Sequence, residues 1–213
     1  MNNTISEIIA PEVEHFRRLI DHAGAELHCA KPGIVQSFDG KGTVTVLLAI
    51  KEKVLQNDMT VKDIAYPILV DVPVIMQRSG GFKATMPIVK GDECLVIFAD
   101  SGIDWWWQSG GCQNKTQDLR RHDLSDGFAI FGPWSIPRNP STYPSNSARI
   151  GKEDDSAYFE VTSSGNINVV GQTLDLSGST VNLGSNTTVD GKNFLSHSHS
   201  GVQGGASDTG PVV

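Results

Sequence analysis

A seven-residue repeat near the C-terminal end restricts the fold of this chain more than any other feature. Written in sevens, residues 167–194 read INVVGQT, LDLSGST, VNLGSNT and TVDGKNF. An apolar–polar–apolar triplet is typical of a short strand with one buried face. In the fourth unit, Thr188 and Asp190 occupy the apolar positions, so the pattern ends or shifts there. The first three units each open with such a pair: Ile167 and Val169, Leu174 and Leu176, Val181 and Leu183.

The length of this repeat predicts a β-helix made by several chains. Seven residues are too few for a helical or propeller repeat, but they suit one strand and one corner per layer. One chain offers only two inward apolar side chains per layer, which cannot enclose a core. Three chains around one axis can, so we predict a homotrimer with an intertwined β-helix shaft over 157–191. A flexible Gly/Ser linker is the alternative, and the strict spacing of six branched aliphatics argues against it.

Composition divides the chain further. Residues 156–213 carry a single basic residue, Lys192, and are dominated by small polar residues, so they cannot form a conventional core from one chain. Residues 136–156 hold three prolines and are expected to form an extended connector. The first 135 residues contain all four tryptophans and read as an ordinary globular region.

The N-terminal segment 1–26 is expected to be helical. A helix over 11–25 would open at Pro11, which is a favoured first helical position. Its apolar residues recur at helical spacing, and this face can pack on its own domain or on another subunit. They are Val13, Phe16, Ile20 and Ala23.

Residues 27–135 are expected to form a small antiparallel barrel of the OB type. Asp39–Gly42 is a hairpin signal between two β-rich runs. A third run, 68–77, contains Pro73, which indicates an edge or a bulge. After a Gly-rich connection, two more runs follow at 93–100 and 126–132. Five short strands with long connections are typical of this fold.

The consecutive tryptophans Trp105, Trp106 and Trp107 have two interpretations. OB barrels bind single strands by stacking bases on aromatic side chains in a basic groove. However, Asp100 and Asp104 flank the cluster, no basic residue lies between 91 and 114, and the net charge is −7. We therefore favour a core or subunit-interface cluster and expect no nucleic-acid partner.

The histidine pair His197 and His199 follows the repeat. In an extended strand, residues two apart point to the same side. Two imidazoles are too few for a stable metal site, but three chains would supply six nitrogens, enough for octahedral coordination of an ion such as Fe(II) or Ni(II). A solvated pair of histidines is the alternative.

No catalytic motif accompanies this pair. GxSxG, HExxH and phosphate-loop patterns are absent, and six histidines would leave no open metal position, so we expect no enzymatic activity.

Three cysteines without CxxC spacing fit a reducing folding compartment. Neither a membrane-spanning run nor a secretory signal is expected.

The order of these features, over residues 28–213, resembles the central spike proteins of contractile-tailed bacteriophages. These baseplate spike or membrane-puncturing proteins are related to the R-type pyocin spike and the VgrG spike of type VI secretion. The run VPVIMQRSGGFKATMPIVKGDECLVIFADSGIDWWWQSG resembles the barrel motif of the family, and HDLSDGFAIFG resembles its closing motif. The terminal HSHSG resembles its apex, assigned to 192–213.

The resemblance implies a structural virion protein at the tip of the tail baseplate, assembled in the host cytoplasm. It implies one iron ion per trimer, held by His197 and His199 of three chains. Implied partners are the tail hub, tube and baseplate proteins, with transient contact to the host outer membrane, which the spike punctures when the sheath contracts. Two other classes stay open: a trimeric tail adhesin that binds host surface glycan, and an OB-fold nucleic-acid binder.

Overall fold

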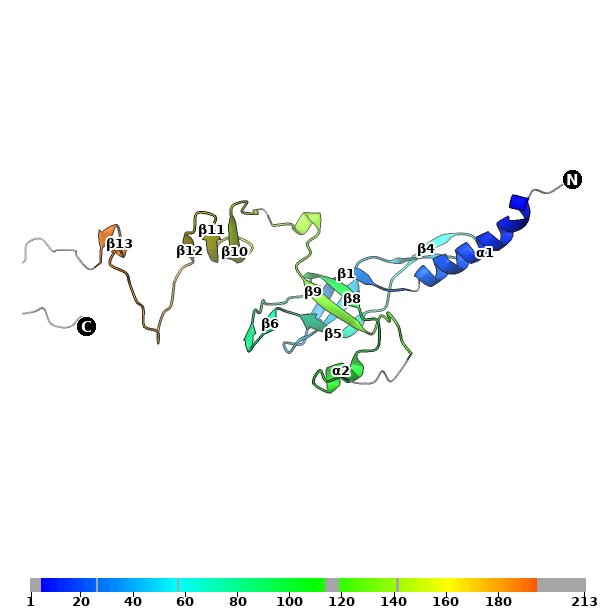
Figure 1. Ribbon diagram of the computed structural model, residues 1–213, viewed down its shortest axis with the longest axis horizontal. Coiled ribbons are helices and arrows are strands. Elements are labelled where there is room, and N and C mark those ends of the chain that lie inside the picture. The colour runs from blue at the N-terminus through cyan, green and yellow to red at the C-terminus, as the bar shows by residue number, and fades with distance from the viewer. Residues whose placement is uncertain (1–4, 26, 57, 114–118, 141, 195–213) are drawn as a thin grey trace, which may run out of the picture. The chain divides into compact units, whose positions relative to one another are not determined.

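The chain forms two structural units, with the boundary between Asn139 and Pro140. The computed structural model describes residues 5–25, 27–56, 58–113, 119–140 and 142–194. The first unit carries the helices α1 and α2 and a β-barrel, and the second carries small antiparallel sheets (Figure 1).

A closed five-stranded barrel forms the centre of the first unit. Its strand order is β1-β2-β5-β9-β8. The barrel is OB-like, as expected, but it is not wholly antiparallel, because β5 and β9 pair in parallel. The barrel closes by pairing its third strand along the chain, β5, with its fifth, β9. This closure makes the two strands run parallel. The strands are β1 (Ala30–Phe38), β2 (Thr43–Leu48), β5 (Leu69–Ile75), β8 (Glu93–Phe98) and β9 (Gly127–Phe131).

The turn at Asp39 confirms the expected hairpin between β1 and β2. One carboxylate oxygen of Asp39 accepts the backbone N–H groups of Lys41, Gly42 and Thr43 at 2.7–2.9 Å. These bonds, that of Thr43 foremost, lower the pKa of Asp39 to about 2. Gly40 adopts a φ of 73°, a conformation that glycine takes without steric cost.

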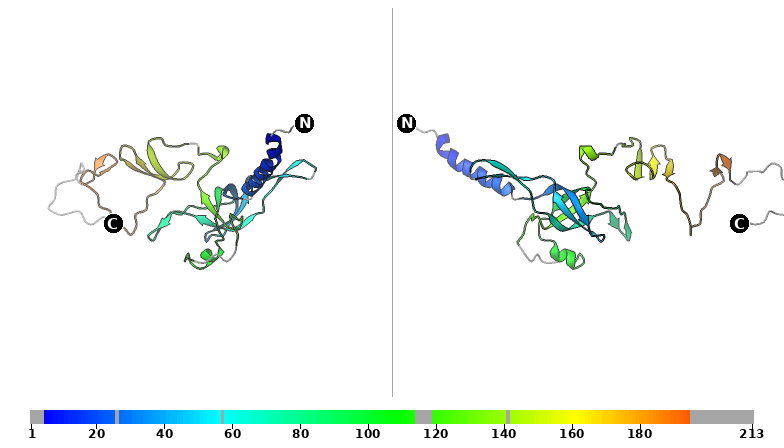
Figure 2. Two further views of the ribbon diagram at one scale, coloured as in Figure 1. Left: turned by 45° about the vertical axis from the view of Figure 1, so that its right-hand side comes forward. Right: turned by 180° about the vertical axis from the view of Figure 1, so that it is seen from behind.

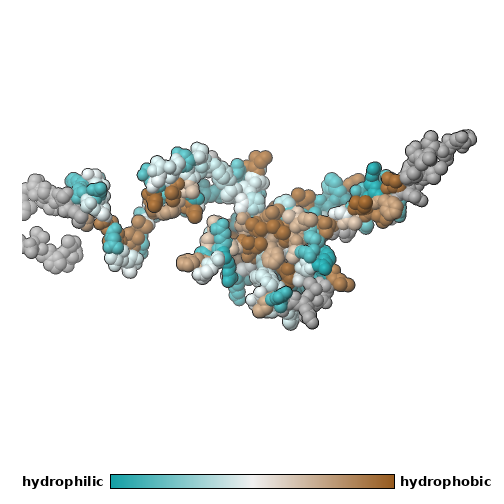
Figure 3. All heavy atoms as spheres, viewed as in Figure 1, coloured by the Kyte–Doolittle hydropathy of each residue, from teal (hydrophilic) through white to brown (hydrophobic). Residues whose placement is uncertain are grey.

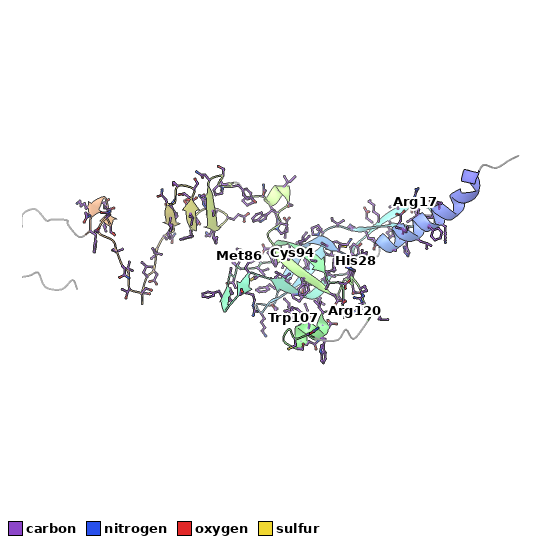
Figure 4. All side chains as sticks on the ribbon, in the orientation of Figure 1. Arg17, His28, Met86, Cys94, Trp107 and Arg120 are labelled. Carbon is purple, nitrogen blue, oxygen red and sulfur yellow. The ribbon has the colours of Figure 1, made fainter. Side chains whose placement is uncertain are left out.

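Alternation of apolar residues along the strands builds the barrel core. In β2, Val44, Val46 and Leu48 point inward and alternate with more exposed residues. Cys94 on β8 lies in the interior, where burial raises the pKa of its thiol to about 11 (Figure 4). The buried apolar residues are Val35, Val44, Val46, Leu48, Leu69, Val72, Ile88, Cys94, Val96, Phe98 and Ala129.

Strand β5 contains the irregularity that its proline predicted. Its register against β2 shifts between Val44 and Val46, and Asp71 adopts a positive φ of 54°. An extra residue on one strand is the mark of a β-bulge. Pro73 itself stays paired opposite Thr43.

Two hairpins of the first unit extend the barrel beyond the expected strands (Figure 2). One joins β3 (Glu52–Leu55) to β4 (Val61–Ile64). The other joins β6 (Arg78–Ser79) to β7 (Phe82–Lys83), inside the segment expected to be only a Gly-rich connection. The paired glycines Gly80 and Gly81, both at positive φ, make that tight turn.

The N-terminal helix is longer than predicted. Helix α1 (Ile5–Ala25) begins before Pro11 rather than at it. A proline removes one backbone donor from a helix, and the apolar spacing continues upstream of it through Ile9 and Ile5. No described helix combines the length and hydrophobicity that a membrane crossing needs.

The second unit begins with a three-stranded antiparallel sheet, in the order β10-β11-β12. Strand β10 lies inside the segment 136–156 that we expected to be an extended connector, because it finds a full partner in β11. Residues 171–187 contain no strand. Backbone hydrogen bonds close turns at Ser179 and Thr187, and a further bond joins Thr187 to Phe194 in the hairpin that follows. The elements are β10 (Ser147–Gly151), β11 (Tyr158–Thr162), β12 (Ile167–Val170), β13 (Thr188–Val189) and β14 (Lys192–Asn193).

Candidate functional site

The three-stranded sheet of the second unit has two faces of opposite character. Cross-strand pairing places Arg149 opposite Glu160, and Glu160 opposite Asn168. The same pairing puts Ile150, Phe159 and Val169 in one row on the other face. In a strand, alternate side chains point to opposite sides, so the sheet sorts polar from apolar residues.

A hydrogen-bonded network covers the polar face. Glu160 is 7% exposed and accepts bonds from Ser147 at 2.6 Å, Arg149 Nη2 at 2.8 Å and Asn168 at 2.9 Å. These bonds, that of Ser147 first, lower the pKa of Glu160 to about 2. Arg149 also binds Asp155 at 2.8 Å. A charge is stable at such low exposure only when paired and hydrogen-bonded in this way.

The same arginine stacks on an aromatic ring. The guanidinium carbon of Arg149 lies 4.0 Å from the ring centroid of Tyr158, a cation–π contact on the neighbouring strand. Together with the network, this contact means that the polar face satisfies its own groups and needs no partner.

The apolar face has no such cover. Figure 3 shows hydrophobic side chains gathered on one side of this sheet and polar ones on the other. The aliphatic and aromatic side chains of the face are all at least 41% exposed. They are Ile150, Phe159, Val161, Ile167 and Val169.

The uncovered stripe continues along the seven-residue repeat. Leu174 is 62% exposed, and the other three repeat positions that follow it are 47–50% exposed: Leu176, Val181 and Leu183. The strands predicted for these repeat units are not present in the single chain. An extended segment needs neighbouring strands for its backbone N–H and C=O groups, and residues 171–187 have none among the described residues of their own chain.

The predicted metal ligands His197 and His199 lie outside the described residues. Within the described residues, no three His, Cys, Asp or Glu side chains gather where they could share a metal ion. The prediction of the tip therefore stays a prediction.

The tryptophan cluster forms the short helix α2 (Asp104–Gln108). Its three rings are 42–47% exposed, so the interpretation as a core cluster is wrong. Trp106 meets Phe128 of β9 edge-on, with the ring centroids 5.8 Å apart.

A buried carboxylate positions the start of this helix. Asp126 is fully buried, and its Oδ1 accepts the backbone N–H of Ile103 at 2.9 Å. Arg120 Nη2 lies 3.6 Å from the same oxygen and 2.6 Å from Asp104 Oδ2. Asp126 thus connects the expected closing motif, HDLSDGFAIFG, to the tryptophans.

A groove of the first unit runs beside α2. Met86, which follows β7, and Trp107 on α2 both line it (Figure 4). Sequence reasoning missed its basic side chains, because Lys41, Arg78 and Lys83 come from distant segments. The groove therefore offers aromatic and cationic groups together. Its apolar lining also includes Phe38, Met76, Trp106 and Phe128.

The closed barrel, with its parallel β5–β9 pair, defines the first unit as an OB-like domain. Residues 31–132 match the family model described as the phage protein Gp138 N-terminal domain. The barrel is therefore similar to a phage protein domain, which agrees with the bacteriophage part of the resemblance seen in the sequence. A search of curated proteins finds no significant match to the chain.

Proposed function

We propose that this protein is the trimeric central spike of a contractile phage tail. In this role it stands at the tip of the baseplate in the virion and punctures the host outer membrane when the sheath contracts. Two findings support the proposal: the barrel matches a phage protein domain, and the second unit leaves one apolar face uncovered.

The uncovered face carries the argument. Burying one large apolar side chain contributes about 1.5–3 kcal/mol, so a stripe from Ile150 to Leu183 represents a large free energy that the single chain leaves unused. A second and a third copy, related by a threefold axis, would cover the stripe with identical stripes. The same association would give residues 171–187 the strand neighbours that the described part of their own chain does not supply.

In such an assembly the polar face would point outward to solvent and the apolar stripe inward. Because Glu160, Arg149 and Tyr158 already satisfy one another, that face is stable in water. Interchain backbone hydrogen bonds in every layer would make the shaft stiff, and its polar exterior would let it pass a membrane without staying inserted.

A metal ion at the apex completes the proposal. His197 and His199 of three chains would offer six imidazole nitrogens, a donor set that suits an octahedral transition-metal ion such as iron. The ion would join the three chains where the shaft is too thin for an apolar core. The barrel would connect the spike to the tail hub, tube and baseplate proteins.

Two adjacent valines allow a matched test. Val169 lies on the apolar face and is 54% exposed, whereas Val170 lies on the polar face and is 40% exposed. We expect the untagged wild type to have the native mass of a trimer. Val169→Asn should shift much of the protein to monomer, because a polar amide would enter the shared core, and Val170→Asn should stay trimeric. A monomeric wild type, or equal behaviour of the two variants, would contradict the proposal.

A further inference from the structure

The N-terminal helix α1 carries a second apolar stripe that its own unit leaves uncovered. Val13, Phe16, Leu19 and Ile20 are 50–70% exposed. Isolated helices gain little stability from propensity alone and depend on packing of an apolar face. We therefore expect this apolar stripe to pack against another surface.

The spacing of the stripe identifies the kind of partner. In heptad positions a to g, Val13 and Ile20 fall at a, and Phe16 and Ala23 fall at d. Intervals of three and four residues that alternate in this way produce the seam of a coiled coil. In sequence the series extends back to Ile9, four residues before Val13.

Charged residues beside the apolar seam favour parallel over antiparallel helices. Arg17 falls at position e, and Glu12, five residues earlier, falls at position g. In a parallel coiled coil, position g of one helix faces position e of the next heptad on its neighbour, so Glu12 and Arg17 are oppositely charged across the seam. In an antiparallel coiled coil, position e faces e and position g faces g, so like charges would face each other across the seam.

Contacts within the helix leave Arg17 available for this role. Glu14, at position b, binds Arg18, at position f, with 3.1 Å between Oε1 and Nε. Arg17 Nη1 is 3.8 Å from the other oxygen of Glu14, and its side chain is 70% exposed. The outward positions therefore pair with each other, whereas among the described side chains the seam-side arginine has only its long contact to Glu14.

We infer that α1 forms a parallel coiled coil with the same helix of the other copies of this chain. The number of helices, three, rests on the proposed trimer. The coil would be a second trimer contact, at the N-terminal end, and would join the copies independently of the β-helix.

Disulfide crosslinking of the full-length protein tests the inference. Cys29 and Cys112 are exposed and are first replaced by Ser, whereas Cys94 is buried and is kept. Ile20→Cys at position a is then compared with Arg18→Cys at position f, under oxidised glutathione. Thiols at position a of parallel helices can approach closely enough for a disulfide, and those at position f cannot. We expect a several-fold higher yield of covalent dimer from Ile20→Cys.

Native mass separates the two proposals. A trimer with equal yields from both variants, or with no dimer from Ile20→Cys, would overturn the coiled coil and leave the spike trimer standing. A monomer would overturn both. As a second measurement, Arg17→Glu should lower the Ile20→Cys yield, and adding Glu12→Arg should restore it. Failure of this restoration would contradict the parallel pairing.

Discussion

On strand β11, Glu160 is 7% exposed while its neighbour Val161 is 41% exposed. A charged residue is thus buried within the single chain, and a hydrophobic one is left in solvent. The relationship reverses the usual preference of these residue types. It fits the proposed trimer, in which the polar face is complete within one chain and other copies would cover the apolar face.

Acid should weaken the second unit through Glu160. The pKa of this carboxyl falls from the ordinary 4.5 to about 2, chiefly through the bond from Ser147. A folded-state pKa below the unfolded one stabilises the fold above pH 4.5, and that stability is lost as the pH falls toward 2. We expect Glu160→Gln to melt several degrees lower than the wild type at pH 6, with the difference shrinking as the pH falls. Melting curves between pH 2 and 6 measure this.

The control for this prediction is Glu153→Gln, a change at an exposed glutamate of the same unit. It should follow the wild type at every pH. A constant difference between Glu160→Gln and the wild type across the whole range would show that the charge of Glu160 is not the cause.

Two carboxylates around Arg120 should differ in their effect on stability. Asp126 is buried and also binds the backbone of Ile103, whereas the side chain of Asp104 is 64% exposed. We expect Asp126→Ala to lower the free energy of unfolding by about 1–3 kcal/mol, because the partly buried N–H of Ile103 loses its acceptor. Asp104→Ala should cost about 1 kcal/mol or less. Urea unfolding followed by tryptophan fluorescence measures both, and equal losses would argue against a structural role of the buried carboxylate.

Gly33 on β1 should not tolerate a side chain. A Cβ there would meet Cγ1 of Val46 and would lie 3.2 Å from Sγ of Cys94. Both neighbours are buried core residues that have little room to move, so Gly33→Ala should cost about 1–3 kcal/mol. At Gly24 in α1 no atom outside the adjoining helix backbone lies within 4 Å of a new Cβ, and Gly24→Ala should be neutral or stabilising. A neutral Gly33→Ala in the same unfolding assay would refute the prediction.

Metal binding should require His197 and His199 and should not require the histidines of α1. We expect one iron ion per trimer in untagged protein, measured by elemental analysis together with native mass. Replacing His197 and His199 by Ala should remove the metal and leave the trimer largely intact, because the apolar stripe is unchanged. The matched control replaces His15 and His22 of α1 by Ala and should keep the metal. Metal retained without His197 and His199 would exclude them as ligands.

Local patterns in the sequence predicted the elements that depend on near neighbours. Short β-rich runs located the five barrel strands, and Asp39 located a turn whose bonds span only a few residues. The seven-residue spacing also located the apolar stripe from Ile167 to Leu183. Each of these features is a property of a short segment, so the residue order carries it directly.

Tertiary structure decided what depends on distant segments. The parallel pairing of β5 with β9 follows from barrel closure, and no local pattern contains it. Lys83 joins the groove of Trp107 because the chain folds back, although the residues around the tryptophans are acidic. Burial of Glu160 likewise requires Ser147 and Asn168 from two other strands. The sequence supplies these residues, but only long-range pairing places their side chains within hydrogen-bonding distance.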